Sequence, residues 1–230
     1  MSITLWVIAI LLAALYGIQK LAQALGAGAA KGVEYLANPR FRTMGFAELP
    51  RWVGLRLTNL RDQFLALGFR ELVNYTWESD HLNYTCVLVS PVGSSCAAVW
   101  VSRHYGLSRW MSVFLGWPAL KRELLVAPRY GLITDLPGAR RFETSPVEIL
   151  AKSQVDGEVE FLTVPASMTL AQVIERHAAA ARAFAARCGA KPILITTAEQ
   201  LFDCERALSA RIAKKIQRDL AGGASGSAVG

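Results

Sequence analysis

The chain begins with one long apolar run. No charged residue interrupts residues 3–18, and the apolar pattern continues past Lys20 to residue 25. Because a helix rises about 1.5 Å per residue, about 20 residues cross a hydrocarbon core of about 30 Å. Residues 3–22 therefore predict a transmembrane helix within an anchor segment, 1–25. Trp6 and Tyr16 lie near its two ends, where such rings favour the interface, and Lys20 can extend its ammonium group to the lipid headgroups.

A cleaved signal peptide is the alternative to this anchor. Residues 22–24 read Ala-Gln-Ala, which resembles a cleavage site. A signal peptide carries Lys or Arg before its apolar stretch, whereas the nearest cation here follows it. The anchor is therefore the preferred interpretation.

The cations beside the anchor predict its orientation. Lys20, Lys31, Arg40 and Arg42 all follow the apolar run. Because positive flanks stay on the cytoplasmic side, we expect the N-terminus outside and the rest of the chain in the cytoplasm.

The segment after the anchor, 26–48, is rich in glycine and alanine up to residue 32. We interpret it as a stalk or linker, although its small-xxx-small spacing also permits close helix packing in a membrane. Asn38 and Pro39 mark a break before the folded domain, which we expect to span residues 49–221.

Within that domain the hydrophobic pattern alternates between helical and strand periods. A helix is expected over 50–67, ended by Gly68, and two more follow the Thr-x-x-Gln capping signals at Thr169 and Thr197. The strands expected from alternation are 69–77, 82–89, 96–102, 122–127, 130–135, 158–164 and 192–196. Residues 139–157 have no clear pattern, and the Gly/Ser/Ala-rich tail, 222–230, is expected to be disordered.

These elements predict an α+β (mixed α/β) fold. We expect one domain with a mainly antiparallel sheet and about three packed helices behind the single transmembrane helix.

The charge of the chain adds little to this picture. Its net charge is +7, but the cations are interleaved with acids and no run of five like charges occurs. Nucleic-acid domains concentrate Lys and Arg on one face with a recognisable motif, so we expect no nucleic-acid partner. Attraction to anionic lipid headgroups accounts for the charge more simply.

The four cysteines have wide spacings and predict free, buried thiols in a reducing compartment. One pair is an exception to consider. Cys86 and Cys96 flank the turn at 90–95 and could face each other across two strands; in an oxidising compartment this is the pair that we expect to bridge.

The segment at 109–122 is strongly apolar with cations at both ends. It contains Arg109, Trp110, Phe114, Trp117 and Lys121. It is too short to cross a bilayer, and its composition is typical of an interfacial segment. It therefore predicts contact with the membrane or with a partner's transmembrane helix; the alternative is a core element that buries its tryptophans.

No motif in the chain indicates catalysis. Phosphate-binding loops, dinucleotide fingerprints, nucleophile elbows and paired histidine ligands are all absent from the sequence, so we predict no catalytic, cofactor or metal site. His81 and His104 lie beside strand ends. His177 shares the apolar face of its helix and is expected to be a hydrogen-bonded core residue. A nucleophile pair of His177 with Cys188 or Cys204 remains an alternative.

The function expected from these features is a non-catalytic, single-pass accessory or scaffold subunit of a larger complex in the cytoplasmic membrane, such as a bacterial inner membrane. Such a complex could be respiratory, photosynthetic, transport or secretion machinery, with other membrane-protein subunits as partners. The alternatives are a membrane-tethered enzyme whose site has no motif and a binding module for a lipid or small ligand.

Overall fold

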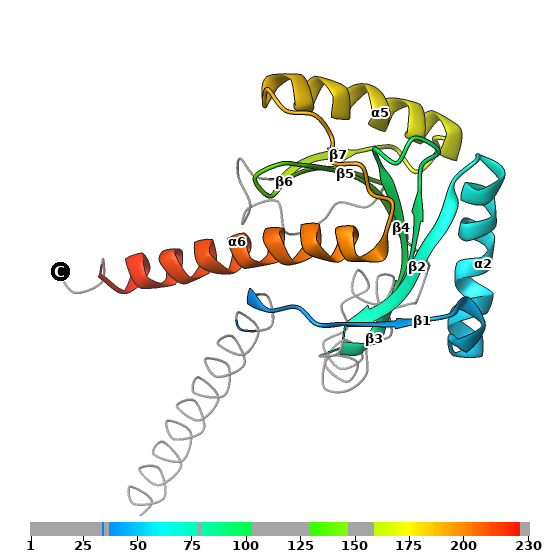
Figure 1. Cartoon of the computed structure of the whole chain (residues 1–230), viewed down its shortest axis with the longest axis horizontal. Helices are drawn as coiled ribbons and strands as arrows, with labels where there is room; N and C mark the ends of the chain where they lie inside the picture. Colours follow the sequence, from blue (N-terminus) through cyan, green and yellow to red (C-terminus); the bar gives the residue numbers. More distant parts are fainter. Residues whose placement is uncertain (1–33, 35–36, 78–79, 103–128, 147–158, 226–230) are drawn as a thin grey trace, which may run out of the picture.

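The structure is a computed structural model, and it describes residues 34, 37–77, 80–102, 129–146 and 159–225 (Figure 1). The described residues form seven strands, three long α-helices and one short 3-10 helix. In chain order these elements are β1 (Phe41–Met44), η1 (Phe46–Glu48), α2 (Arg51–Ala66), β2 (Arg70–Trp77), β3 (Asp80–Val89), β4 (Cys96–Ser102), β5 (Arg129–Leu136), β6 (Arg140–Ser145), β7 (Val159–Thr163), α5 (Leu170–Arg187) and α6 (Ala198–Ser225).

The seven strands form one sheet in the order of the chain, β1 to β7. Each neighbouring pair from β1 to β6 is antiparallel, and β6 and β7 are parallel. The expected α+β domain with a mainly antiparallel sheet and three helices is therefore confirmed.

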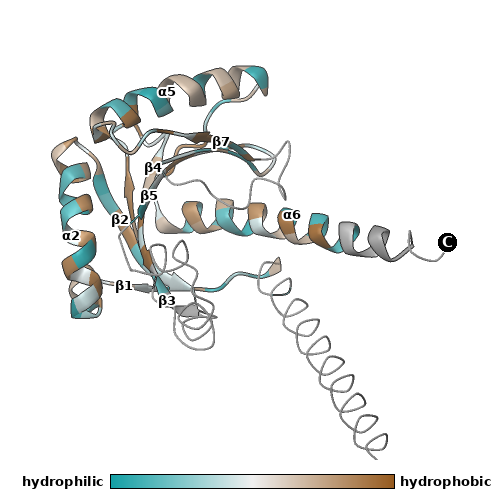
Figure 2. Ribbon diagram, turned by 180° about the vertical axis from the view of Figure 1, so that it is seen from behind, coloured by the Kyte–Doolittle hydropathy of each residue, from teal (hydrophilic) through white to brown (hydrophobic). Residues whose placement is uncertain are grey.

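The helices cover both faces of the sheet, with α5 on one side and α6 on the other (Figure 1). Helix α2 shares the α5 side, because Val53 and Leu57 of α2 and Val173 of α5 belong to one buried cluster. On the opposite face, Leu201 and Phe202 of α6 pack against strand side chains. The strands between these layers combine hydrophobic and polar residues (Figure 2), and their apolar side chains contribute to buried clusters on both faces of the sheet.

Local signals fix both ends of α2 and the start of α5. Pro50 caps the start of α2, and Gly68 follows its end with a φ of +85°, a left-handed conformation that glycine adopts without steric cost. At the start of α5, the Thr169 side chain accepts a hydrogen bond from the Gln172 N–H, and the Gln172 side chain accepts one from the Thr169 N–H. The predicted capping box is confirmed.

Two strand predictions need correction. The stretch without a clear pattern contains β6, whose Arg140–Ser145 run pairs with β5 on one side and β7 on the other. Residues 192–196 form an extended connection and no strand. Its Ile193 N–H donates to the Asp135 carbonyl and its Ile195 N–H to the Gly93 carbonyl, which gives two isolated hydrogen bonds in place of a ladder.

Helix α6 also runs further than the sequence predicted. It continues through Gly222 and Gly223 to Ser225, into the stretch expected to be a disordered tail. A glycine inside a helix costs about 1 kcal/mol relative to alanine, and α6 nevertheless continues past both glycines to Ala224 and Ser225.

The interpretation in which Cys86 and Cys96 face each other is wrong. Cys86 pairs with Val99, whereas Cys96 pairs with Val89. Because successive side chains in a strand point to opposite faces, the two thiols lie on opposite faces of the sheet. Cys86 packs in the α2 layer and Cys96 in the α6 layer. All four cysteines are free thiols, as expected.

Among the described helices, none has the length and apolar character needed to cross a membrane. The predicted span, residues 3–22, lies outside the described residues, as do the strand expected at 122–127 and the segment at 109–122.

Candidate functional site

A group of buried charges lies between the sheet and α6. The Arg141 guanidinium of β6 binds the Asp135 carboxylate of β5 through two hydrogen bonds, Nε to Oδ1 at 2.7 Å and Nη2 to Oδ2 at 3.3 Å. The same Nη2 lies 2.8 Å from Glu205 Oε1 on α6. With Arg141 only 5% exposed, this charge cluster connects two strands to the helix that covers them.

The strand register places these side chains together. Asp135 and Arg141 are directly opposite each other in the antiparallel β5–β6 pair, so their side chains leave the same face of the sheet. The turn between the strands contains Gly138 at φ +79° and Ala139 at φ +55°. Glu205 reaches the cluster from the second turn of α6.

The electrostatics of the cluster favour a charged guanidinium. Burial lowers the pKa of Arg141, but the carboxylates of Asp135 and Glu205 more than offset that effect and hold it well above its usual value. One guanidinium therefore faces two carboxylates, and the cluster carries an excess of negative charge.

A third carboxyl group, Glu143, lies on the same face of β6 beside the cluster. A Cβ atom added at Gly131 would sit 3.3 Å from Glu143 Oε1 and 3.4 Å from Trp100 Cζ3, so this carboxyl group rests over bare backbone next to an indole ring. Burial raises the pKa of Glu143 to about 7; Arg141 opposes the shift, and the neighbouring carboxylates add to it. Glu143 is thus a carboxyl group that keeps its proton close to neutral pH.

Two thiols share this layer. Burial raises the pKa of Cys96 to about 12 and that of Cys204 to about 11, with Asp135 adding to both shifts. Because the thiolate is the nucleophile, thiols that hold their protons this strongly are poor nucleophiles at neutral pH.

A second polar cluster lies on the opposite face, under α5. His177 is 1% exposed; its Nε2 lies 2.9 Å from Thr134 Oγ1 and its Nδ1 lies 2.9 Å from Thr144 Oγ1. Ser95 Oγ lies a further 2.9 Å from Thr134 Oγ1. Burial lowers the pKa of His177 to about 4, so the ring is neutral at physiological pH. The prediction of a hydrogen-bonded core histidine is confirmed.

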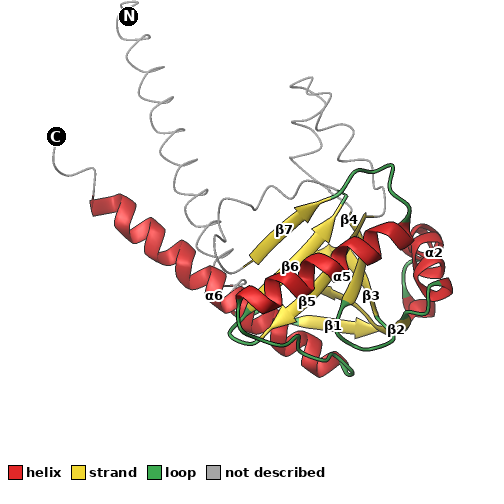
Figure 3. Ribbon diagram, turned by 90° about the horizontal axis from the view of Figure 1, so that it is seen from above, coloured by secondary structure: helices red, strands yellow, loops and turns green. Residues whose placement is uncertain are grey.

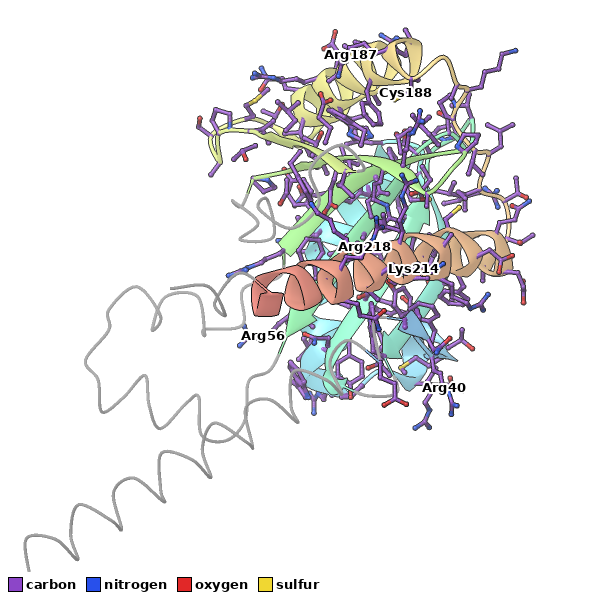
Figure 4. The ribbon with its side chains drawn as sticks, turned by 90° about the vertical axis from the view of Figure 1, so that its left-hand side faces the viewer. Arg40, Arg56, Arg187, Cys188, Lys214 and Arg218 are labelled. Atoms are coloured by element: carbon purple, nitrogen blue, oxygen red, sulfur yellow. The ribbon has the colours of Figure 1, made fainter. Side chains whose placement is uncertain are left out.

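The alternative of a Cys–His nucleophile pair is wrong for both cysteines. Cys204 lies on α6, across the sheet from His177 on α5. Cys188 follows the end of α5 (Figure 4). It lies 11 residues after His177, which corresponds to about 16 Å along the helix axis. A nucleophile and its base must lie within hydrogen-bonding distance.

Both clusters are satisfied internally. The charged groups around Arg141 bind one another, and each ring nitrogen of His177 has a threonine hydroxyl. Within the described ranges, no three His, Cys, Asp or Glu side chains are grouped so that they could hold a metal ion. The pKa of Glu143 lies near neutral pH, and its described neighbours include Gly131, Trp100, the ion-paired Arg141 and the carboxyl groups of Asp135 and Glu205.

The residues that the sequence singled out as contacts with a membrane or partner are not among those described. These are Trp6, Tyr16, Lys20, Arg109, Trp110, Phe114, Trp117 and Lys121, together with His104. Sequence reasoning in turn missed Arg141, Glu143 and Glu205. The available signal was the alternation in β6, Arg141-Phe142-Glu143-Thr144, directly after a Pro-Gly turn.

Comparison with known proteins does not extend this description. No protein-family model, no curated protein and no solved structure matches the chain.

Proposed function

We propose that this protein is a non-catalytic accessory or scaffold subunit of a larger cytoplasmic-membrane complex. Residues 3–22 anchor it with the N-terminus outside, and the α+β domain stands at the cytoplasmic surface. The tryptophan-rich segment at 109–122 contacts the membrane interface or a neighbouring subunit.

The proposal rests on the strand ends at which the chain enters and leaves the sheet. Phe41, the first residue of β1, pairs with Trp77 at the end of β2, and Trp77 in turn pairs with Asp80. On the next strands, Asn83 pairs with Ser102 and Trp100 pairs with Arg129.

These pairings bring Phe41, Ser102 and Arg129 to the same end of their strands. The segment that leads back to the predicted anchor and both ends of the stretch containing residues 109–122 therefore leave the domain on one side. A shared exit supports contact of both segments with one membrane surface, where Trp and flanking cations are favoured.

The chemistry of the domain supports a structural role over catalysis. The buried titratable groups around Arg141 and His177 form ion pairs and hydrogen bonds that hold α6 and α5 to the sheet. An enzyme built on Glu143, the alternative with an observation in its favour, needs a group beside it to bind or attack a substrate. Gly131 and Trp100 offer no such group, and Arg141, Asp135 and Glu205 bind one another.

The test is extraction of the tagged full chain from native membranes in mild detergent, followed by native-gel separation and mass spectrometry of comigrating proteins. We expect reproducible comigration with one large complex. Migration at the size of a monomer or small oligomer under several mild detergents would contradict the proposal.

A triple variant tests the role of the tryptophan-rich segment in the same assay. Trp110→Ala with Phe114→Ala and Trp117→Ala should release the chain from the complex. Val92→Ala is the matched control, because Val92 is an exposed apolar residue, 73% accessible, in the turn at the opposite end of β3 and β4.

A further inference from the structure

The C-terminal end of α6 extends past the sheet. The helix has 28 residues, which corresponds to about 42 Å, and it begins under β1 to β3, where Phe202 stacks on Phe41 at 4.6 Å. Beyond the charge cluster at Glu205 it crosses β5 to β7 and continues outward (Figure 1, Figure 3). Its last turns therefore lack the support of the sheet.

The second half of α6 is basic along one side. Arg211, Lys214 and Arg218 are spaced three and four residues apart, so they share one helix face, which we call the basic stripe. Lys214 and Arg218 are exposed (Figure 4). Lys215 flanks the stripe, and Asp219 is the one acid between residues 206 and 225.

Interactions within the domain do not account for Lys214 and Arg218. The Arg211 guanidinium donates to the Gly138 carbonyl in the β5–β6 turn, and Arg218 Nε donates to the Lys214 carbonyl within the helix. Among the side chains that the structure describes, no carboxylate pairs with Lys214 or Arg218.

The helix dipole does not account for them either. Cations favour the C-terminus of a helix within its last turn, where the unpaired carbonyl groups lie. The last turn of α6 contains no basic residue, and Arg218 stands seven residues before Ser225.

The basic stripe belongs to the helix that contacts the start of the first strand. Because Phe41 stacks on Phe202, the chain enters the domain against α6, and the start of the described chain runs beside this helix (Figure 1, Figure 2). Arg40 and Arg42 add exposed cations at that entry point. A chain anchored through residues 3–22 therefore holds this helix near the membrane surface.

We infer that the basic stripe of α6 docks on anionic phospholipid headgroups of the cytoplasmic leaflet and fixes the orientation of the domain on the membrane. This inference rests on the proposed membrane anchoring. The leaflet is negatively charged, and each Lys or Arg close to it adds to the attraction within about one Debye length.

The experiment uses the full chain in lipid nanodiscs and measures hydrogen exchange of the amides at 211–225. One nanodisc contains phosphatidylcholine alone, and the other contains phosphatidylcholine mixed with phosphatidylglycerol. We expect these amides to exchange several-fold more slowly with phosphatidylglycerol present. Raising the salt from about 0.1 M to about 1 M, which shortens the Debye length from about 10 Å to about 3 Å, should remove the difference.

Charge-reversal variants distinguish an effect of the basic stripe from an effect of the protein's overall charge. Lys214→Glu with Arg218→Glu should abolish the protection by phosphatidylglycerol. The matched control is Arg176→Glu with Arg182→Glu, which reverses two exposed cations on α5, on the other side of the sheet, and should leave the protection intact.

The possible failures are distinguishable. A chain that does not incorporate into either nanodisc contradicts the proposed anchoring. A chain that incorporates, but whose 211–225 amides exchange equally in both lipids, overturns the lipid-docking inference and leaves the anchoring standing. Protection by transfer RNA without protection by phosphatidylglycerol also overturns it, in favour of a nucleic-acid surface.

Discussion

Replacing Glu143 with glutamine should change how the stability of the protein depends on pH. Folding raises the pKa of this carboxyl group from 4.5 to about 7. The unfolded chain therefore releases the proton above about pH 4.5 while the folded chain keeps it, so the folded state loses stability as pH rises from 4.5 to 7. A shift of 2.5 pKa units corresponds to about 3 kcal/mol.

His177 produces a dependence of opposite sign. Folding lowers its pKa from 6.5 to about 4. Between these pH values the histidine binds a proton in the unfolded chain but not in the folded chain. The folded state therefore loses stability as pH falls from 6.5 to 4. Between pH 4.5 and 6.5 the two groups oppose each other, each with a slope of about 1.4 kcal/mol per pH unit, and their contributions cancel.

Glu143→Gln removes one of the two slopes. The variant should match the wild type near pH 4.5 and exceed its free energy of unfolding by up to about 3 kcal/mol at pH 8. Between pH 4.5 and 6.5 its stability should rise with pH, because the slope from His177 is no longer opposed.

The assay is urea unfolding of the full chain in mild detergent at pH 4.5, 5.5, 6.5 and 8, followed by tryptophan fluorescence. Glu160→Gln is the matched control: it removes a β7 carboxylate that forms an exposed ion pair with Arg187, a contact worth about 1 kcal/mol or less. If the pH curves of Glu143→Gln and the wild type run parallel from 4.5 to 8, Glu143 is not held protonated by its surroundings and the reasoning fails.

Three further predictions follow from the buried clusters. Arg141→Ala leaves two buried carboxylates without their cation and should cost about 3–5 kcal/mol, measured by urea unfolding at pH 7. Thr144→Val leaves Nδ1 of His177 without its partner and should cost about 1–3 kcal/mol in the same assay, whereas a cost near zero would mean that the hydroxyl does not bind the ring. With a thiol reagent at pH 8, half-buried Cys188 should react first and Cys86, whose pKa burial raises to about 12, only after unfolding.

The parts of the fold that the sequence predicts are those with local causes. Helix α2 begins after a proline and is followed by a glycine, and α5 begins at a Thr-x-x-Gln box. These helix ends depend on a few neighbouring residues. The meander of β2 to β4 follows from alternating apolar residues separated by short polar turns.

The parts that it does not predict depend on long-range partners. β6 contains three charged residues in six, which argues against a buried strand. It forms one because Asp135 and Glu205, 6 and 64 positions away from Arg141 in the sequence, neutralise that guanidinium. The sequence does not predict the charge cluster for the same reason, because its members come from three different elements.

The register of the β3–β4 hairpin illustrates another limit. Whether Cys86 and Cys96 share a face depends on which residues pair across the six-residue turn, and a shift by one residue reverses every side chain of a strand. The turn has Gly93 at φ +75° and two hydrogen bonds between Ser90 and Ser95, and these details set the register that places the thiols apart.

The attachment of the helices differs between the two faces, and this difference bears on function. Helices α2 and α5 are held by buried apolar clusters that include Phe64 and Phe184. Helix α6 is held by the buried apolar cluster around Leu201 and Phe202 at its start, and then also by the ion pair between Glu205 and Arg141. The Arg141 cluster is therefore the polar contact through which a membrane surface or a partner subunit that displaced α6 would act on the sheet.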